Sequence, residues 1–288
     1  MSTTDERLSQ LDGLLETLGS VLVCYSGGVD SAFLLAAAKR VLGARAIGMT
    51  AVSPSLAPAE LDDAVRVARE IGADHRVVES AEIHDPSYQK NAPDRCFYCK
   101  SELYRIAEQR RVEWGLAHVV NGTNVDDLGD YRPGLEAAKN AGVRSPFVEL
   151  GMTKEDVREG ARRAGLGIWD KPAAACLSSR IPFGTSVTPE RLERIGRFEA
   201  SLRGLGFRRV RVRYHAVGSD QDKAFARIEL DPSEIPRACS EGVREAIVEA
   251  GTRAGFLYAA VDLRGYRVGS HNEALDLAPR GRALPVVR

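Results

Sequence analysis

The 288-residue chain has no run of about 18 apolar residues, so no membrane-spanning helix is expected. Its first residues, Met1 to Arg7, contain no apolar segment and become acidic early, unlike a secretory signal. Neither sign of charge is in excess, because 40 basic residues balance 40 acidic ones. Proteins that bind long nucleic acids usually carry a net positive charge. These absences predict a cytoplasmic protein that acts on a small molecule, with neither a membrane nor a long nucleic acid as its partner.

Cysteine is scarce and odd in number, with five residues and no secretory signal. Such a count does not indicate a disulfide framework, so reduced thiols are expected. Cys24 lies inside an apolar run and Cys239 near the start of an expected late helix. Both are interpreted as core or incidental thiols, since free cysteine is commonly buried. The five histidines show no ligand spacing and receive no role.

Short apolar runs alternate with segments of helical spacing through the first half of the chain. This alternation predicts an α/β fold built on a doubly wound parallel sheet. Strands are expected at 21–25, 46–52, 75–78 and 117–120, and helices at 8–18, 32–41, 59–71, 97–112 and 153–164.

The segment from Trp169 to Gly184 contains two prolines, small residues and no sustained period, and is interpreted as an ordered loop. A domain boundary is expected directly after it. Residues 1–184 would form the nucleotide-binding domain and residues 185–288 a smaller α+β domain for substrate binding or oligomerisation. In the second domain, helices are expected at 189–202 and 243–250, and strands at 210–214, 226–230 and 256–261.

A glycine loop, Ser26-Gly27-Gly28-Val29-Asp30-Ser31, follows the first buried strand and opens a helix. At such a place, free backbone N–H groups and the positive helix end point at one spot, which favours phosphate. Glycine lets the backbone approach closely, and the two serines can add hydroxyl donors. Asp30 would repel phosphate, so it is interpreted as a partner of Mg²⁺. The alternative is a plain strand-to-helix turn.

A second polar patch, Asn121-Gly122-Thr123-Asn124-Val125-Asp126-Asp127, follows the fourth expected strand. Ligands bind at this carboxyl edge of open α/β sheets. Gly122 and Thr123 are therefore expected near the nucleotide. Asp126 is expected to hold metal or position substrate, as is Asp127. The alternative is a surface turn whose carboxylates cap a helix.

Cys96 and Cys99 form a C-x-x-C pair, and Cys176 lies far along the chain in the ordered loop. The pair alone fits half a zinc site, a redox pair or a chance spacing. Three thiolates can hold three irons of a [4Fe–4S] cluster and leave the fourth iron open, where a sulfide can bind.

Three arginines alternate with valines in Arg209-Val210-Arg211-Val212-Arg213. The strand period places the arginines on one face, where their guanidinium groups suit the phosphate and carboxylates of a small anionic substrate. The alternative is a solvated strand face.

The glycine loop matches neither the Walker pattern nor G-x-G-x-x-G. It resembles the PP-loop of the N-type ATP-pyrophosphatases. The resemblance implies that ATP is cleaved between its α- and β-phosphates and that the loop holds pyrophosphate. It also implies that the end of the second strand, Thr50 to Ser53, meets the adenine.

Four motifs together resemble the LarE-type sulfur insertases, which act in making the nickel-pincer nucleotide cofactor of lactate racemase. They are S-G-G-V-D-S, R-C-F-Y-C-K, N-G-T-N-V-D-D and W-D-K-P-A-A-A-C-L-S-S-R-I-P-F-G. The resemblance implies that ATP adenylates the carboxylates of pyridinium-3,5-biscarboxylic acid mononucleotide, which sulfur converts to thiocarboxylates. In one branch of the family a cysteine matching Cys176 gives up its own sulfur. In the other, three cysteines hold a [4Fe–4S] cluster, and Cys96 and Cys99 favour that branch here.

Further roles are implied by the resemblance alone. Ser179 and Arg180 are expected to act in catalysis beside Cys176, and Arg267 to bind substrate. Glu199 and Asp231 are expected either to bind a divalent metal or to be ordinary surface acids. The family also implies a homo-oligomer, with possible partner proteins that supply sulfide or insert nickel.

Three other functions remain open from the sequence. The chain could be a tRNA or other small-molecule thiolation enzyme of the same superfamily. It could be an amide ligase related to NAD or GMP synthetase, which would leave the three cysteines without a role. It could also be a nucleotide-binding or metal-sensing module without catalytic activity.

Overall fold

The structure is a computed structural model that describes residues 4–129, 133–172, 174–218 and 220–267. Contacts divide the chain into two compact units between Cys176 and Leu177. The boundary expected directly after residue 184 therefore lies inside the second unit. No helix within the described ranges is long and apolar enough to cross a membrane.

The first unit is built on a four-stranded parallel sheet with the order β3-β2-β1-β4. This confirms the predicted α/β fold. The strands are β1 (Val21–Cys24), β2 (Ala46–Val52), β3 (Asp74–Glu79) and β4 (His118–Val120). Because β1 lies between β2 and β4, the order of the strands reverses at its carboxyl end, where open α/β sheets bind their ligands.

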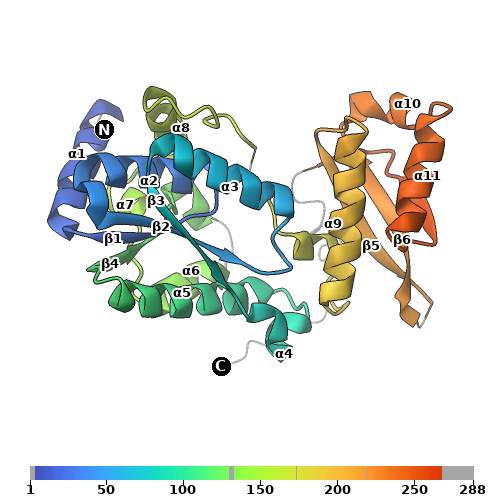
Figure 1. The fold of residues 1–288 in the computed structure, drawn as a ribbon, viewed down its shortest axis with the longest axis horizontal. Helices are drawn as coiled ribbons and strands as arrows, with labels where there is room; N and C mark the ends of the chain where they lie inside the picture. Colours follow the sequence, from blue (N-terminus) through green and yellow to red (C-terminus); the bar gives the residue numbers. More distant parts are fainter. Residues whose placement is uncertain (1–3, 130–132, 173, 219, 268–288) are drawn as a thin grey trace. The chain divides into compact units, whose positions relative to one another are not determined.

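Helices cover both faces of this sheet (Figure 1). Val21 and Val23 pack into a core with α1, α2, α3 and α8, whereas Leu22 packs on the opposite face against α5. The helices are α1 (Thr4–Leu18), α2 (Val29–Leu42), α3 (Pro58–Ile71), α4 (Pro86–Gln89), α5 (Arg95–Glu113), α6 (Pro133–Asn140), α7 (Pro146–Glu149) and α8 (Lys154–Arg163). Short 3₁₀ turns are η1 (Gly43–Arg45), η2 (Glu82–His84) and η3 (Val125–Gly129).

The second unit contains a mixed three-stranded sheet with the order β5-β6-β7. β5 (Val210–Val217) and β6 (Asp220–Leu230) are antiparallel, and β7 (Tyr258–Val261) is parallel to β6. The helices are α9 (Pro189–Gly204), α10 (Ile235–Ala238) and α11 (Val243–Arg253), with 3₁₀ turns η4 (Leu177–Arg180) and η5 (Pro232–Glu234). The rings of Phe198, Tyr214 and Phe256 join α9, β5 and the segment before β7 in its core.

Several element boundaries differ from the sequence-based expectations. Helix α2 begins at Val29 rather than at Ala32, so half of the glycine loop forms its first turn. The expected last strand begins at Tyr258 rather than Phe256, whose side chain is buried in the core instead. The short helices α4, α7 and α10 were missed because four residues are too few to show a helical period.

Helix α8 begins with a capping box formed by Thr153 and Asp156. Thr153 Oγ1 accepts from the Asp156 N–H at 3.2 Å, and Asp156 Oδ2 accepts from the Thr153 N–H at 2.8 Å. The Asp156 carboxylate also accepts from Thr4 and Arg7 of α1. Burial favours the protonated acid, but these hydrogen bonds outweigh it and lower the pKa of Asp156 to about 2. One carboxylate thus joins the two helices.

Replacing Asp156 with asparagine is expected to lower the free energy of unfolding at pH 7 by about 2 kcal/mol. The folded-state pKa lies below the unfolded one, so the carboxylate's contribution is present above about pH 4 and is lost as pH falls toward 2. Urea unfolding at pH 7 and pH 3 measures it. The difference between wild type and variant should shrink at pH 3, and the exposed control Asp62→Asn should change neither value. If wild type and Asp156→Asn differed by the same free energy of unfolding at both pH values, the stabilisation would not come from the ionised carboxylate.

Candidate functional site

The glycine loop follows the carboxyl end of β1, and Gly27 is its glycine with a positive φ. Gly27 has a φ of +73°, which L side chains rarely adopt. A Cβ at this position would lie 2.8 Å from the Cβ of Ala64 in α3. Glycine is therefore required twice, once for the backbone conformation and once for close packing on α3.

The two serines of the loop contact each other. Ser31 Oγ lies 3.1 Å from Ser26 Oγ, accepts from the Ser26 N–H at 3.1 Å and donates to the Gly28 carbonyl at 3.2 Å. Ser31 thus holds the loop in shape, a use that the sequence did not suggest. Gly28 is the N-cap residue of α2 and has no side chain to accept from the first free N–H groups of that helix. Those N–H groups are suited to bind an anion.

The second polar patch meets the glycine loop at the carboxyl edge of the sheet. A Cβ on Gly122 would lie 2.9 Å from the Asp30 carbonyl carbon and 2.9 Å from the Ser31 nitrogen. Asn124, which is buried, donates from Nδ2 to Asp30 Oδ1 at 2.9 Å. Burial raises the pKa of Asp30, while nearby Lys154 and the hydrogen bond from Asn124 lower it. This hydrogen bond joins residues 94 positions apart, so two distant segments of the chain form one site.

The two aspartates of the patch stabilise local structure. Asp126 Oδ2 accepts from the Lys154 N–H at 2.5 Å, at the start of α8. Asp127 Oδ2 accepts from the Asn124 N–H at 3.2 Å and closes the turn. Both contacts fit the alternative interpretation of this patch, a surface turn whose carboxylates cap a helix. Thr123 donates its N–H to Asn121 Oδ1 at 3.1 Å, which orders the backbone beside Gly122.

The hydroxyls at the end of β2 are engaged within the protein. Thr50 Oγ1 donates to the Tyr25 carbonyl at 2.9 Å and lies 2.8 Å from Nε2 of His75. Ser53 donates to the buried carboxylate of Glu82. Burial lowers the pKa of His75, which keeps its ring neutral near pH 7. Sequence reasoning gave His75 no role because a single histidine in a strand carries no spacing signal.

All five cysteines are described, and none forms a disulfide. Cys96 is exposed in the first turn of α5, Cys99 lies one turn later, and Cys176 is exposed. Burial raises the pKa of Cys99 to about 12, and the charges of Cys176 and Cys96 act in the same direction, so the three thiols lie within electrostatic range. No three His, Cys, Asp or Glu side chains among the described residues are grouped closely enough to hold a metal.

These thiols suit an iron–sulfur cluster by their chemical type, but their positions in this structure do not form a metal site. Three thiols are a suitable donor set, but a Cys99 thiol with a pKa of about 12 is protonated near pH 7. Cluster binding would have to displace that proton. Cys24 is partly buried, and burial raises its pKa to about 12. Cys239 is exposed after α10, so of the two interpretations, core or incidental thiol, it fits the incidental one.

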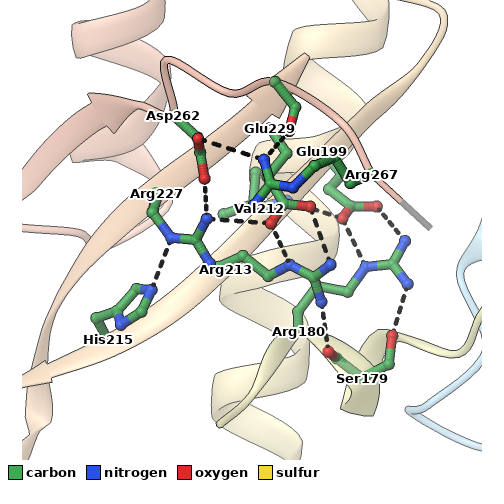
Figure 2. A network of polar contacts seen from close by, with 11 residues as sticks. Ser179, Arg180, Glu199, Val212, Arg213, His215, Arg227, Glu229, Asp262 and Arg267 are labelled. Carbon is green, nitrogen blue, oxygen red and sulfur yellow. Dashed lines mark hydrogen bonds and ion pairs between the residues drawn. The ribbon is translucent and has the colours of Figure 1, made fainter. Parts of the chain in front are cut away.

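A buried ionic network occupies the second unit (Figure 2). The side chain of Arg213 is 3% exposed and that of Glu229 is 0% exposed, and they form a bidentate pair at 3.0 and 2.9 Å. Arg213 Nη1 donates to the Ser179 carbonyl at 2.7 Å. Arg227 joins the same carboxylate at 3.1 Å and also contacts Asp262. Arg213 therefore orders the η4 turn directly after Cys176.

Glu199 connects the η4 turn to α9 and β5 (Figure 2). Its carboxylate, 0% exposed, accepts from Arg180 at 2.8 and 3.3 Å, from Arg203 at 3.1 Å and from the Val212 N–H at 3.0 Å. These donors occupy both oxygens, an arrangement unlike that of the expected surface acid. Arg180 also donates to Ser179 Oγ at 3.0 Å.

Replacing Glu199 with glutamine is expected to destabilise the protein by about 3–5 kcal/mol, because it removes the negative charge of a carboxylate buried against the Arg180 guanidinium. Thermal or urea unfolding measures this loss. The control is Glu193→Gln on the same helix, whose exposed pair with Arg197 spans 3.8 Å. That variant should change stability by less than about 0.5 kcal/mol. Equal effects of the two substitutions would contradict the conclusion that the buried Glu199 carboxylate stabilises the fold.

The other expected substrate arginines lie around Tyr266. The guanidinium carbon of Arg211 lies 4.5 Å from the ring centroid, and that of Arg209 lies 5.8 Å from it. Arg211 and Arg213 are both buried, so the alternative of a solvated strand face was wrong for these two arginines. Burial also lowers the pKa of Arg211. Arg267 contacts Asp262 at 3.7 Å and donates to the Gly265 carbonyl.

Asp231 lies at the end of β6, and its carboxylate caps η5. It accepts from the Ser233 N–H at 3.1 Å and from the Ser233 hydroxyl at 2.7 Å, and it lies 4.0 Å from Arg209. These contacts hold a turn. No group of three or more side chains that could hold a metal ion, with or without Asp231 and Glu199, occurs among the described residues.

Comparison with known proteins gives three relatives that match along most of their length. The chain is 44% identical over 271 residues to an uncharacterised protein of Synechocystis sp., covering 94% of this chain and 98% of that protein. It is 34% identical over 279 residues to pyridinium-3,5-bisthiocarboxylic acid mononucleotide synthase of Lactiplantibacillus plantarum, covering 96% and 98%. An uncharacterised protein of Methanocaldococcus jannaschii is 28% identical over 247 residues, covering 86% and 90%. No family model matches the chain.

Proposed function

Because the chain belongs to the LarE-type family of pyridinium-3,5-bisthiocarboxylic acid mononucleotide synthase, we propose that it inserts sulfur into the precursor of the nickel-pincer nucleotide. The substrate in this proposal is pyridinium-3,5-biscarboxylic acid mononucleotide, and ATP activates its carboxylates. The observation that carries the proposal is the junction of the glycine loop with Gly122 and Asn124 at the point where the strand order reverses. The thiocarboxylate product would serve the cofactor of lactate racemase.

The activation step uses the carboxyl edge of the first unit. A substrate carboxylate oxygen attacks the α-phosphorus of ATP, the bond to the β-phosphate oxygen breaks, and pyrophosphate leaves toward the N–H groups at the start of α2. In this proposal Asp30 binds the Mg²⁺ that balances the phosphate charge, which is supported by the hydrogen bond from Asn124 that fixes the Asp30 carboxylate. The hydroxyls of Thr50 and Ser53 have partners within the protein, so backbone groups of residues 50–53 are the ones offered to the base.

The sulfur step follows from the three thiols. A sulfur nucleophile attacks the activated acyl carbon and AMP leaves, because adenylation has turned an oxygen of the carboxylate into a good leaving group. In this proposal Cys96, Cys99 and Cys176 would hold a [4Fe–4S] cluster, whose chemistry would be to bind a sulfide for the substrate. Its support is the electrostatic proximity of the three thiols. The alternative is that Cys176 gives up its own sulfur.

The arginines of the second unit divide into two groups in this proposal. Arg211 and Arg209, beside Tyr266, bind the phosphate and a carboxylate of the substrate, together with Arg267. Arg180 and Arg213 order Ser179 and the η4 turn next to Cys176. A homo-oligomer, a cytoplasmic location and partner proteins that supply sulfide or insert nickel belong to the same proposal.

Pyrophosphate release in the presence of different acceptors tests the proposed activation. Release should depend on the biscarboxylic acid mononucleotide, and a pyridinium mononucleotide without carboxylates should give none. Release stimulated by tRNA with a steep salt dependence would instead support a tRNA thiolation enzyme. Consumption of ammonia with formation of an amide would support an amide ligase. ATP binding without release for any acceptor would support a module without catalytic activity.

A further inference from the structure

Lys171 lies in the loop before Cys176 and takes no part in the proposed reaction. Its Nζ lies 3.0 Å from Oε2 of Glu60 and 2.9 Å from Oδ2 of Asp63, both on α3. The lysine side chain is only 20% exposed, so water screens this contact incompletely. The Lys171 N–H donates to the Ile168 carbonyl at 2.8 Å, which closes the turn around the charged group. The side chain therefore binds α3, while the backbone is fixed in a turn with Ile168.

The same part of α3 supports the glycine loop. Ala64 follows Asp63 directly and lies four residues after Glu60, on the same face of the helix. Tyr25 donates its hydroxyl to the Ala64 carbonyl at 2.9 Å, and Gly27 packs on Ala64 so closely that only a glycine fits. One turn of α3 thus contacts both the loop before Cys176 and the loop that would bind pyrophosphate.

The position of Lys171 limits where Cys176 can lie. Five peptide units separate the two residues, so their α-carbons are at most about 17 Å apart in a fully extended chain. Pro172 removes one degree of backbone freedom next to the lysine. Without the contact to α3 the thiol would sample a larger volume. Reactions between two groups held by one protein slow strongly when their relative position loosens.

We infer that Lys171 is a positioning residue that ties the Cys176 segment to the helix supporting the glycine loop, so that the sulfur donor meets the substrate where it is activated. This inference rests on the proposed function. The competing explanation is an ion pair that only stabilises the fold. Partly exposed ion pairs contribute little to folding, so that explanation predicts small and equal effects on both steps of the reaction.

The test compares the two steps in Lys171→Met. Substrate-dependent pyrophosphate release should stay within about twofold of wild type, while thiocarboxylate formation should fall about tenfold, because only the second step needs Cys176 in place. Lys171→Arg should recover most of the product, since it keeps the charge. The matched control is Arg66→Met, because Arg66 pairs with Asp63 at 3.1 Å and with Glu70 at 2.7 Å without touching the loop. Equal losses in both steps, or no loss of product, would overturn the inference.

A second readout does not depend on activity. The chain has two tryptophans, and Trp169 lies two residues before Lys171. In a Trp114→Phe background, time-resolved fluorescence anisotropy reports the local motion of Trp169 alone. The amplitude of nanosecond motion should rise in Lys171→Met and not in Arg66→Met. Unchanged motion would refute the anchor whatever the activity. A wild-type enzyme that makes no thiocarboxylate would instead contradict the proposed function and leave the anchor to be decided by this measurement.

Discussion

Replacing Cys176 with serine is expected to lower thiocarboxylate formation by about 100-fold or more while substrate-dependent pyrophosphate release stays within about twofold. A serine hydroxyl can neither give up sulfur nor replace a thiolate as an iron ligand. In the proposed function, activation takes place at the glycine loop, whose described contacts do not include Cys176. The two steps should therefore separate, and assays of pyrophosphate and of thiolated product on the same samples measure both.

Cys239→Ser is the matched control for this substitution. Cys239 is also exposed, but it follows the short helix α10 in the second unit. It should leave both steps unchanged. Thiolated product from Cys176→Ser at the wild-type rate would remove Cys176 from the sulfur step.

Gly27→Ala is expected to lower pyrophosphate release by about 100-fold, because the preorganised N–H groups of the loop would move. The positive φ of +73° costs an alanine roughly 1–2 kcal/mol. The new Cβ would also lie 2.8 Å from the Cβ of Ala64 and 2.9 Å from its Cα, so the loop must shift away from α3. Steady-state pyrophosphate release with saturating ATP measures the effect.

Gly72→Ala separates backbone strain from this collision. Gly72 ends α3 with a φ of +70°, and a Cβ there would meet no atom within 4 Å. The variant should lose a comparable amount of stability from its positive φ and keep its rate of pyrophosphate release. Equal losses of activity in the two variants would mean that strain alone, rather than the position of the loop, controls the reaction.

The layout of the first unit could be predicted because local patterns and physical rules agree there. Buried parallel strands appear as continuous apolar runs, and the glycine loop and the patch after β4 both follow such runs. The carboxyl ends of neighbouring parallel strands meet at one edge, so the approach of Gly122 to Asp30 was implied by topology. The capping box at Thr153 is equally local, since its two hydrogen bonds join residues three apart.

The use of individual polar side chains could not be predicted, because partners distant in sequence decide it. Arg213 alternates with valine like a substrate-facing arginine, yet Glu229 on the paired strand binds two of its nitrogens. The sequence around Asp126 predicts a metal ligand, but in the structure its carboxylate accepts the N–H of Lys154 at the start of α8. Lys171 has no charged neighbour at helical spacing, and its partners on α3 lie 111 and 108 positions earlier.

One measurement tests the central claim, that ATP activation at the glycine loop is coupled to sulfur insertion through Cys176. Mass spectrometry after a single turnover would weigh both the small-molecule product and the protein chain. The account predicts AMP, pyrophosphate and a substrate in which one carboxylate oxygen has been replaced by sulfur. An unchanged chain mass would support the cluster route, and a chain lacking the sulfur of Cys176 the sacrificial one. A substrate of unchanged mass beside consumed ATP would contradict the account.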